Sequence, residues 1–534
     1  MPLYLGLDSS TQSLTAIVVE VESHRRQVVF QSSMSFDAAL PQYGTRHGVL
    51  PHADPALAYS SPLLWAEALD LMLARLALSG LDLSRLAAIS GSAQQHGSVY
   101  LAAGAEALLA AADPDRPIHE QIAPALSRPV SPIWLDTSTS AECAEITASV
   151  GGAALLAQKT GSRAFERFTG PQIRKFFKRE SAAYAATDRI HLVSSFLASL
   201  LVGRHAPLDP GDGSGMNLMD LRTSTWWKAA LEATAPGLLA RLPLILPSRS
   251  VIGTLSPYWQ RRHGLPAARI IAWSGDNPCS LIGTGLVREG IVAVSMGTSD
   301  TIFGLMREPR VDGTGTGHVF GSPTGEFMGL TVFSNGSLAR ERIRDAYGLT
   351  WTTFSTALEA TPPGNGGRML LPWFEPEITP AVTRPGLRRF ELDAGDGPGN
   401  VRAIVEAQQM ALARHSRWMG VDVKTIHATG GAAANRAMLQ VMADVFGADV
   451  YQFEVGNTAG LGAALRAFHG DATAVGQSLD WEDVVRGLAE PVASTRVRPD
   501  PRAHSIYTEL MPLYAKREAE ALRYETPSSS STTS

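Results

Sequence analysis

Two stretches of the chain decide its fold: LYLGLDSSTQSLTAIV at residues 3–18 and IVAVSMGTSDTIFGLM at residues 291–306. Each reads as an apolar strand, a short turn of Asp, Gly, Ser and Thr, and a second apolar strand, which is the pattern of a β-hairpin. Because the same plan occurs in both parts of the chain, we predict two related domains. Each would present one polar turn to a shared cleft, with the boundary near residues 283–290.

The rest of the chain indicates an α/β protein. Short apolar runs that end in Gly, Ser, Thr or Asp alternate with longer helical patterns. Residues 62–76 are too rich in apolar positions for an exposed helix and are expected to pack on a sheet. Residues 435–445 carry apolar side chains at helical spacing. We place the two domains at residues 1–286 and 287–524, followed by a low-complexity, disordered tail at 525–534.

Composition limits the function. The 534 residues are 45% hydrophobic and 18% charged, with a formal net charge of −5. This is typical of a globular protein and gives no basic footprint for nucleic acid. The isolated cysteines Cys143 and Cys279 fit neither a zinc motif nor a disulfide scaffold. The start lacks a secretory signal, and the most apolar stretch, 192–202, is too short to span a membrane. We therefore expect a cytoplasmic protein without a membrane partner.

Several familiar motifs are missing. The sequence has no GxxxxGK[ST], so a P-loop is excluded, and its glycine clusters lack the setting of a dinucleotide fingerprint. It also has no HExxH and no GxSxG, which removes the main support for a metalloprotease or a serine hydrolase.

The two hairpin turns are candidate phosphate sites. In the first, Asp8 ends a strand and is followed by hydroxyls and closely spaced N–H groups that reach Thr11. Such turns form anion-binding concavities, and a neighbouring carboxylate can hold hydrated Mg²⁺. In the second, Gly297 permits close approach of a ligand to the backbone, beside Thr298 and Ser299. The alternative is a pair of ordinary hairpin turns.

The ends of two predicted strands are also candidate ligand sites. After the strand at 270–275, Asp276 or Asn277 can cap the helix that Pro278 starts. A carboxylate at this position could act as a base toward a sugar hydroxyl or could be a plain N-cap. After the strand at 425–429, Gly430 and Gly431 would let a flat ligand such as adenine lie on the backbone, although a tight turn is the alternative.

Polar residues at 94–97, QQHG, follow another apolar run and suit hydrogen bonding to a polyol through His96. Arg167 lies between two aromatic residues and could contact a sugar or pair with Glu166. Asp136 has the same ambiguity.

Taken in order, the first turn, QQHG, ERFTG, SGDNP, SMGTSD and ATGGAAANR form a set. This set resembles the FGGY carbohydrate kinases, most closely the xylulose kinases of the animal type. The resemblance runs from about Leu3 to about Gly470. It implies two actin-like (ribonuclease H-like) ATPase domains with a cleft between them, ATP and Mg²⁺ as cofactors, and a small ketose as substrate.

The resemblance also implies residue roles. Asp8 would face the metal, and Asp276 would be the general base. The ketose would be held by His96, Arg167, Asp276 and Asn277. The nucleotide would be bound by Thr11, Gly297, Thr298, Ser299, Trp351, Gly430, Gly431 and Asn435.

Departures from the family pattern leave alternatives open. Many bacterial xylulose kinases carry QMHG where this chain has QQHG, and glycerol kinases have an Arg-Glu pair that is absent here. We expect D-xylulose to be phosphorylated to D-xylulose 5-phosphate by a monomer or homodimer. Ribulose, arabinitol or glycerol is the first alternative substrate, and an actin-like nucleotide switch without sugar chemistry is the second.

Overall fold

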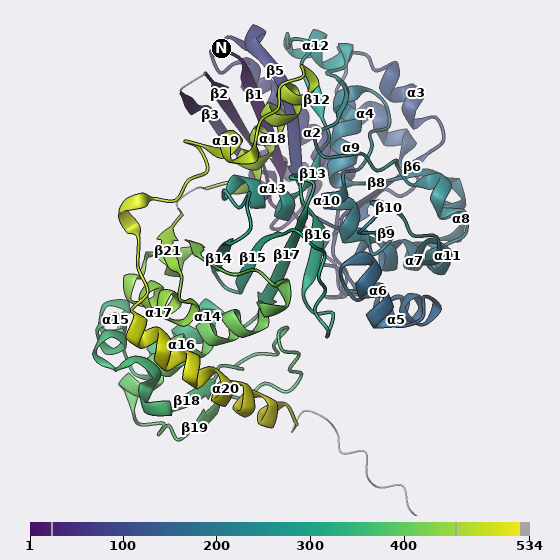
Figure 1. The fold of residues 1–534 in the computed structure, drawn as a ribbon. Coiled ribbons are helices and arrows are strands. Elements are labelled where there is room, and N and C mark those ends of the chain that lie inside the picture. The colour runs from purple at the N-terminus through teal and green to yellow at the C-terminus, as the bar shows by residue number, and fades with distance from the viewer. Residues whose placement is uncertain (23–24, 454–455, 524–534) are drawn as a thin grey trace, which may run out of the picture.

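The computed structural model describes residues 1–22, 25–453 and 456–523, so the tail predicted at 525–534 lies outside the described residues. Two mixed sheets organise the chain (Figure 1). The first has the order β11 (Val251–Thr254), β12 (Arg269–Ile271), β5 (Leu86–Ala93), β1 (Leu3–Ser9), β2 (Ser13–Val21) and β3 (Arg26–Ser35), with β13 (Ser274–Gly275) also on β5. The second has the order β16 (His318–Gly321), β17 (Phe327–Phe333), β15 (Asp300–Met306), β14 (Ile291–Met296), β20 (Thr425–Thr429) and β21 (Asp449–Gln452).

The sheets repeat one topology. In the first, β1 and β2 form an antiparallel hairpin, β3 extends it, and β5 and β12 join in parallel on the other side. In the second, β14, β15, β17, β20 and β21 occupy the corresponding places with the same strand directions. Both predicted hairpins are therefore confirmed, and each turn lies at the centre of its sheet.

Helices cover the first sheet and build an outer lobe beside it. The predicted helix at 62–76 is α2 (Pro62–Ala77); Ser61 caps it by accepting from the Leu63 N–H at 3.3 Å. We call the part of the molecule built on the first sheet the first half, and the part built on the second sheet the second half. Leu64, Trp65 and Leu69 of α2 are buried in the core of the first half, together with the apolar α9 (Val193–Val202). The lobe includes β6 (Ser98–Ala102), β8 (Thr187–Leu192), α5 (Ser140–Ser149), α6 (Ala153–Thr160), α7 (Thr169–Arg179), α10 (Pro210–Gly213) and α11 (Lys228–Thr234).

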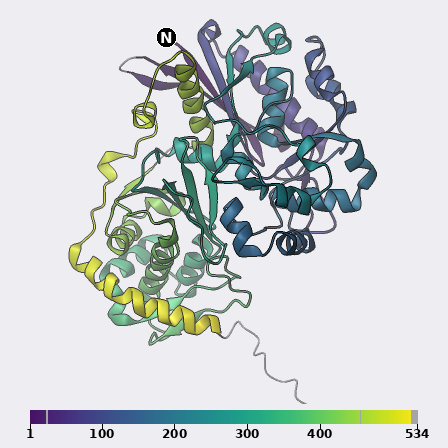
Figure 2. The same ribbon diagram turned by 45° about the vertical axis from the view of Figure 1, so that its right-hand side comes forward.

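The second sheet is covered by its own helices. These are α14 (Ser337–Ala346), α15 (Trp351–Ala360), α16 (Gly397–His415), α17 (Arg436–Phe446) and α20 (Pro501–Arg523), with the small pair β18 (Met369–Leu371) and β19 (Arg388–Phe390). The helix predicted at 435–445 corresponds to α17, which Asn435 caps. Figure 2 shows α20, in yellow, along the end of this half that lies away from the first half.

Two helices lie between the halves. Helix α13 (Asp276–Gly283) packs against α18 (Thr458–Ala474), and α18 also lies on β1 and β5 of the first sheet. Glycines allow this close approach: a Cβ atom at Gly6 would collide with the Gly460 carbonyl oxygen, and one at Gly462 with that of Cys279. The boundary after residue 286 stays a prediction, but α18 shows that the later part of the chain returns to the first sheet.

No helix in the described part of the chain has the length and apolar character needed to span a bilayer. Cys143 and Cys279 are both free and buried.

Candidate functional site

The first polar turn presents a buried carboxylate, one oxygen of which has no partner in the described part of the chain. Strand β1 is buried along its whole length and delivers Asp8 just before the turn, with 8% of the residue exposed. Its Oδ1 atom has no hydrogen-bond partner among the described residues. Burial raises the pKa of this carboxyl to about 6. An orphaned buried oxygen of this kind is costly unless something binds it.

Asp276 lies at the carboxyl ends of the same parallel strands as Asp8. Within β5, Ser92 pairs with Asp8 of β1 on one side and with Ser274 of β13 on the other. Asp276 follows β13 directly, and its pKa is raised to about 7, first by burial and then by the charge of Asp8. The structure thus brings the predicted metal residue and the predicted base into one electrostatic environment.

The capping prediction at this position was wrong. Helix α13 begins at Asp276 rather than at Pro278, its N-cap is Gly275, and no side chain caps it. The Asp276 Oδ1 atom instead accepts from the Asn277 N–H at 2.8 Å and from Asn277 Nδ2 at 3.1 Å. Local bonds therefore fix the carboxylate within the first turn of the helix.

The QQHG segment contacts Asn277 through Gln95. Its Oε1 accepts from Asn277 Nδ2 at 2.8 Å, and its Nε2 lies 3.4 Å from the Gly211 carbonyl oxygen. Both side-chain bonds of Asn277 use its Nδ2 atom, so no bond among the described residues engages its Oδ1. That oxygen is left to accept from a ligand hydroxyl.

His96 is buried in an unusual backbone conformation, with φ at +72°. Its Nδ1 lies 2.8 Å from the Gly215 carbonyl oxygen. A carbonyl oxygen only accepts, so Nδ1 carries the proton and Nε2 is an acceptor. Burial and the charge of Arg167 lower the pKa of this imidazole to about 3, which keeps it neutral.

Arg167 does not pair with Glu166 within the described residues. Its Nη2 atom lies 2.9 Å from Nε2 of His318, and its guanidinium stacks over the Phe165 ring at 5.1 Å. Sequence reasoning missed His318, because it stands alone at the start of a short strand and no motif marks it. For Asp136 the contacts favour a structural role over sugar binding. It is fully buried and accepts hydrogen bonds from Ala58 N at 3.2 Å and from Gln172 Nε2 at 2.8 Å.

Thr11 has a partner that the sequence did not reveal. Its hydroxyl accepts from the Trp134 indole at 2.8 Å, although Trp134 is 41% exposed. The two residues are far apart in the sequence, so no local pattern could have paired them.

The second polar turn is built from close backbone contacts. Ser337 donates its N–H to the Gly297 carbonyl at 2.8 Å. A Cβ atom at Gly336 would lie 2.6 Å from the Thr298 carbonyl oxygen, and one at Gly430, where φ is +86°, would lie 2.7 Å from that of Met296. Three segments can therefore meet here only because these positions lack side chains.

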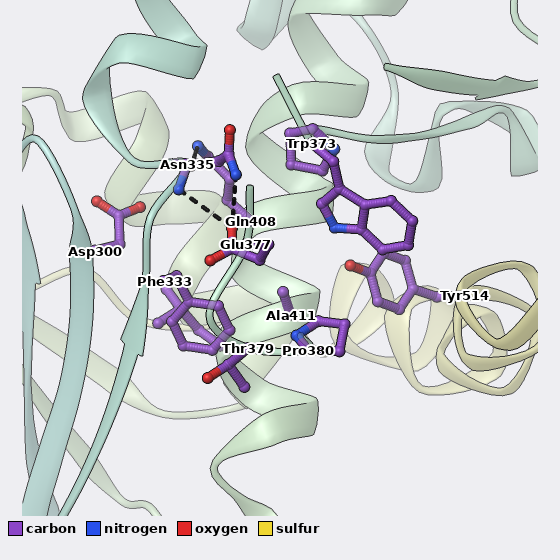
Figure 3. Close-up of a pocket in the computed structure, with 12 residues that line it drawn as sticks. Asp300, Phe333, Asn335, Trp373, Glu377, Thr379, Pro380, Gln408, Ala411 and Tyr514 are labelled. Atoms are coloured by element: carbon purple, nitrogen blue, oxygen red, sulfur yellow. Dashed lines mark hydrogen bonds between the residues drawn. The ribbon is translucent and has the colours of Figure 1, made fainter. Parts of the chain in front are cut away.

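A buried polar network lies behind this turn. Asp300, which follows Ser299, is bound by Arg340 at 2.7 Å, and the same guanidinium donates to Gln408 at 2.8 Å. Asp300 and Gln408 line a cavity of about 20 Å³. Figure 3 shows these residues with Asn335, which donates to Glu377; the two atoms are 2.9 Å apart. This network anchors the turn through buried charge-assisted bonds.

Beside the second turn is a cavity of about 690 Å³ formed entirely by the second half. Its lining includes Trp351, Gly431 and Asn435, which brings together three of the residues predicted to bind nucleotide. Trp351 is 40% exposed, and Gly431 has open space where a Cβ would point. Asn435 caps α17 by accepting from the Met438 N–H at 3.1 Å and donates to Ser355 at 2.8 Å, so its amide is already partly engaged.

Comparison with known proteins agrees with this architecture. Residues 120–283 match the model of the N-terminal domain of the FGGY family of carbohydrate kinases, and residues 292–470 match that of the C-terminal domain. The chain is 43% identical over 530 residues to a xylulose kinase of Rattus norvegicus, covering 97% of both chains. It is 42% identical over 493 residues to xylulose kinase 2 of Arabidopsis thaliana, covering 88% of this chain and 87% of the relative. The crystal structure of xylulose kinase from Rhodospirillum rubrum superposes with a TM-score of 0.80 at 20% identity, covering 98% of this chain and 99% of the other.

The repeated sheet topology, with a polar turn in each half, defines a fold of two actin-like domains. More particularly, the chain belongs to the FGGY family of carbohydrate kinases and is an enzyme that phosphorylates a sugar with ATP.

Proposed function

We propose that this enzyme transfers the γ-phosphoryl group of ATP to D-xylulose and forms D-xylulose 5-phosphate. The choice of sugar is supported by the names of the relatives, which match the chain over nearly its whole length. The observation that carries the chemistry is the pair of neighbouring carboxyls, Asp8 and Asp276, at the carboxyl ends of β1 and β13.

Asp276 is the general base of this proposal. A base works best when its pKa lies close to the working pH, and the pKa of Asp276 is raised to about 7. Its carboxylate would accept the proton of the terminal hydroxyl as the new O–P bond forms and the bond to the leaving ADP oxygen breaks. The protein otherwise positions and stabilises, because phosphoryl transfer needs little covalent help.

Asp8 would hold Mg²⁺. The described residues contain no group of three or more His, Cys, Asp or Glu suited to a metal ion, which argues against a cage made of protein alone. Mg²⁺ usually binds through one or two carboxylates plus phosphate oxygens, and the unpartnered Oδ1 of Asp8 fits that mode. When bound, Mg²⁺ neutralises charge on the transferring phosphoryl group.

The ketose would be held by groups of complementary polarity. Nε2 of the neutral His96 and Oδ1 of Asn277 can accept from sugar hydroxyls, whereas Arg167 can donate to sugar oxygens. The adenosine would occupy the cavity lined by Trp351, Gly431 and Asn435, and its phosphates would lie along Thr11 and the turn formed by Gly297, Thr298 and Ser299.

A cytoplasmic location is also proposed, in line with two buried free cysteines.

A coupled ADP-release assay with D-xylulose, D-ribulose, L-arabinitol and glycerol tests the substrate. We expect the highest kcat/KM with D-xylulose. If millimolar D-xylulose leaves ADP release at the background rate, the assignment of the sugar fails. ADP release that no acceptor stimulates would favour the nucleotide switch.

Replacing the base tests the mechanism. Asp276→Ala should lower kcat by about 10²–10⁴-fold, because a positioned base contributes that much, while ADP binding stays nearly unchanged. Asp444→Asn is a matched control: Asp444 is also a buried carboxyl with a raised pKa, but it lies on α17 and bonds to Asp500 N at 2.8 Å. Near-normal turnover by Asp276→Ala would remove Asp276 from the role of base.

A further inference from the structure

Strand β16 belongs to the second sheet, but its outer edge is attached to the first half. It is the edge strand of its sheet, and Val319 donates its N–H to the Gly161 carbonyl at 3.0 Å while Gly321 donates to Ser214 Oγ at 3.1 Å. A Cβ atom at Gly161, where φ is +90°, would collide with the Val319 carbonyl oxygen. The first residue of this strand, His318, is thereby inserted into the lobe that carries Arg167.

His318 makes two side-chain bonds there and is 2% exposed. Arg167 Nη2 lies 2.9 Å from Nε2, and Ser162 Oγ lies 3.0 Å from Nδ1. A guanidinium only donates, so Nε2 accepts and Nδ1 carries the proton toward Ser162. The imidazole is therefore neutral in this arrangement, with both nitrogens engaged.

Arg167 differs from other enclosed arginines of this chain. Arg340 is paired with Asp300 at 2.7 Å and Arg402 with Glu406 at 2.6 Å. Among the described residues, no carboxylate lies within ion-pair distance of Arg167, whose polar partner is the neutral His318. A neutral acceptor fixes the direction of a guanidinium without neutralising its charge, which leaves the remaining N–H donors for oxygen atoms of a ligand.

An aromatic wall completes the arrangement. The His318 ring lies 4.9 Å from that of Phe165 and 5.7 Å from that of Phe168. Phe168 also contacts the His96 ring at 4.4 Å, and the Arg167 guanidinium is 5.8 Å from Phe168. His318, Arg167 and His96 therefore all pack against Phe168, and the second half contributes His318 to this aromatic enclosure.

We propose that His318 is a positioning residue for sugar recognition: it holds Arg167 in the orientation that meets the ketose, so this site requires strand β16 of the nucleotide-binding half. The proposal rests on the proposed function, in which Arg167 contacts the sugar. An arginine side chain loses rotamer freedom when it is fixed. Because His318 fixes it before the sugar arrives, binding does not bear this cost.

The test is a double-mutant cycle measured with the full-length enzyme. His318→Phe keeps a ring in the enclosure but removes the acceptor, and should raise KM for D-xylulose about tenfold or more, since bonds to charged groups are worth that much. KM for ATP should stay within about twofold of wild type. His318→Gln, whose amide oxygen can accept from Arg167, should recover most of the loss.

The cycle separates this role from a structural one. If His318 acts through Arg167, the double variant His318→Phe/Arg167→Ala should be no worse than Arg167→Ala alone. His191→Phe is the matched control, because His191 is also fully buried but bonds Ser195 and His205 instead; it should leave KM for D-xylulose unchanged.

Additive effects, an unchanged KM in His318→Phe, or an equal rise of both KM values would overturn the proposal. Failure of the proposed function gives a different result, since wild-type enzyme would then show no turnover of D-xylulose. If another sugar is the better acceptor, the cycle is run with that sugar and the same outcomes decide.

Discussion

At the scale of single residues, the Asp276 carboxyl is the most informative group. Its pKa is raised to about 7 by burial and by the neighbouring Asp8. A raised pKa means that the carboxyl is protonated, and unable to act as a base, below that pH. We therefore expect kcat/KM for the ketose to rise with pH along an acid limb whose apparent pKa is near 7.

A profile of kcat/KM from pH 5 to pH 9 measures this limb. Because two carboxyls interact, the apparent value belongs to the pair rather than to one residue. A profile that is already flat above pH 5, as an aspartate with an ordinary pKa of about 4 would give, would contradict the proposed environment of Asp276.

The same carboxyl should reduce stability. A carboxyl whose pKa is higher in the folded state than in the unfolded state favours folding at low pH, and this advantage is lost as the pH rises through about 7. At pH 8 the buried ionised form therefore costs free energy, which Asp276→Asn removes. We expect this inactive variant to have a higher Tm than wild type at pH 8, with a smaller difference at pH 5. Thermal scans at both pH values measure it, and a lower Tm of the variant at pH 8 would refute the argument.

At the scale of elements, the two hairpins, α2 and α17 were predictable because their signals are local. Apolar periodicity, turn residues and caps all act within a few positions of one another. Local signals suggested candidate site residues where an apolar strand ended at a polar residue, as at Asp8 and Asp276, and the roles of these residues stay predictions. His318 and Trp134 were not, because their partners, Arg167 and Thr11, come from distant segments.

The contact between α13 and α18 is an element-scale feature with a measurable consequence. A Cβ atom at Gly462 would collide with the Cys279 carbonyl oxygen, which is backbone and cannot turn aside. Gly462→Ala should therefore destabilise the protein by about 1–3 kcal/mol or more, as overpacking does. It should also lower kcat, because α13 carries Asp276 in its first turn.

Denaturant unfolding and steady-state kinetics of Gly462→Ala measure both effects. Gly313→Ala is the control, since a Cβ at Gly313 meets no atom within 4 Å. Gly462→Ala with wild-type stability would show that the two helices can separate at little cost.

At the scale of the whole molecule, the two halves carry different parts of the candidate site. Asp8 and Asp276 lie at strand ends of the first sheet, whereas the cavity of about 690 Å³ is lined entirely by the second half. The halves meet through α13, α18 and the edge strand β16. This arrangement would keep the affinities for the two substrates separable even though the chemistry requires both.

Separate variants should reveal that division. Trp351→Ala removes an exposed aromatic face from the cavity and should raise KM for ATP roughly tenfold, as loss of base stacking does, with little change in KM for the ketose. Arg167→Ala should do the opposite, raising KM for the ketose about tenfold or more. Trp481→Ala, which removes a ring stacked on His469 at 4.2 Å, is the control for loss of a tryptophan outside the cavity. Parallel kinetics with each substrate varied in turn measure the split. If Trp351→Ala changed both KM values equally, the cavity would not be an independent nucleotide site, and the division between the halves would have to be abandoned.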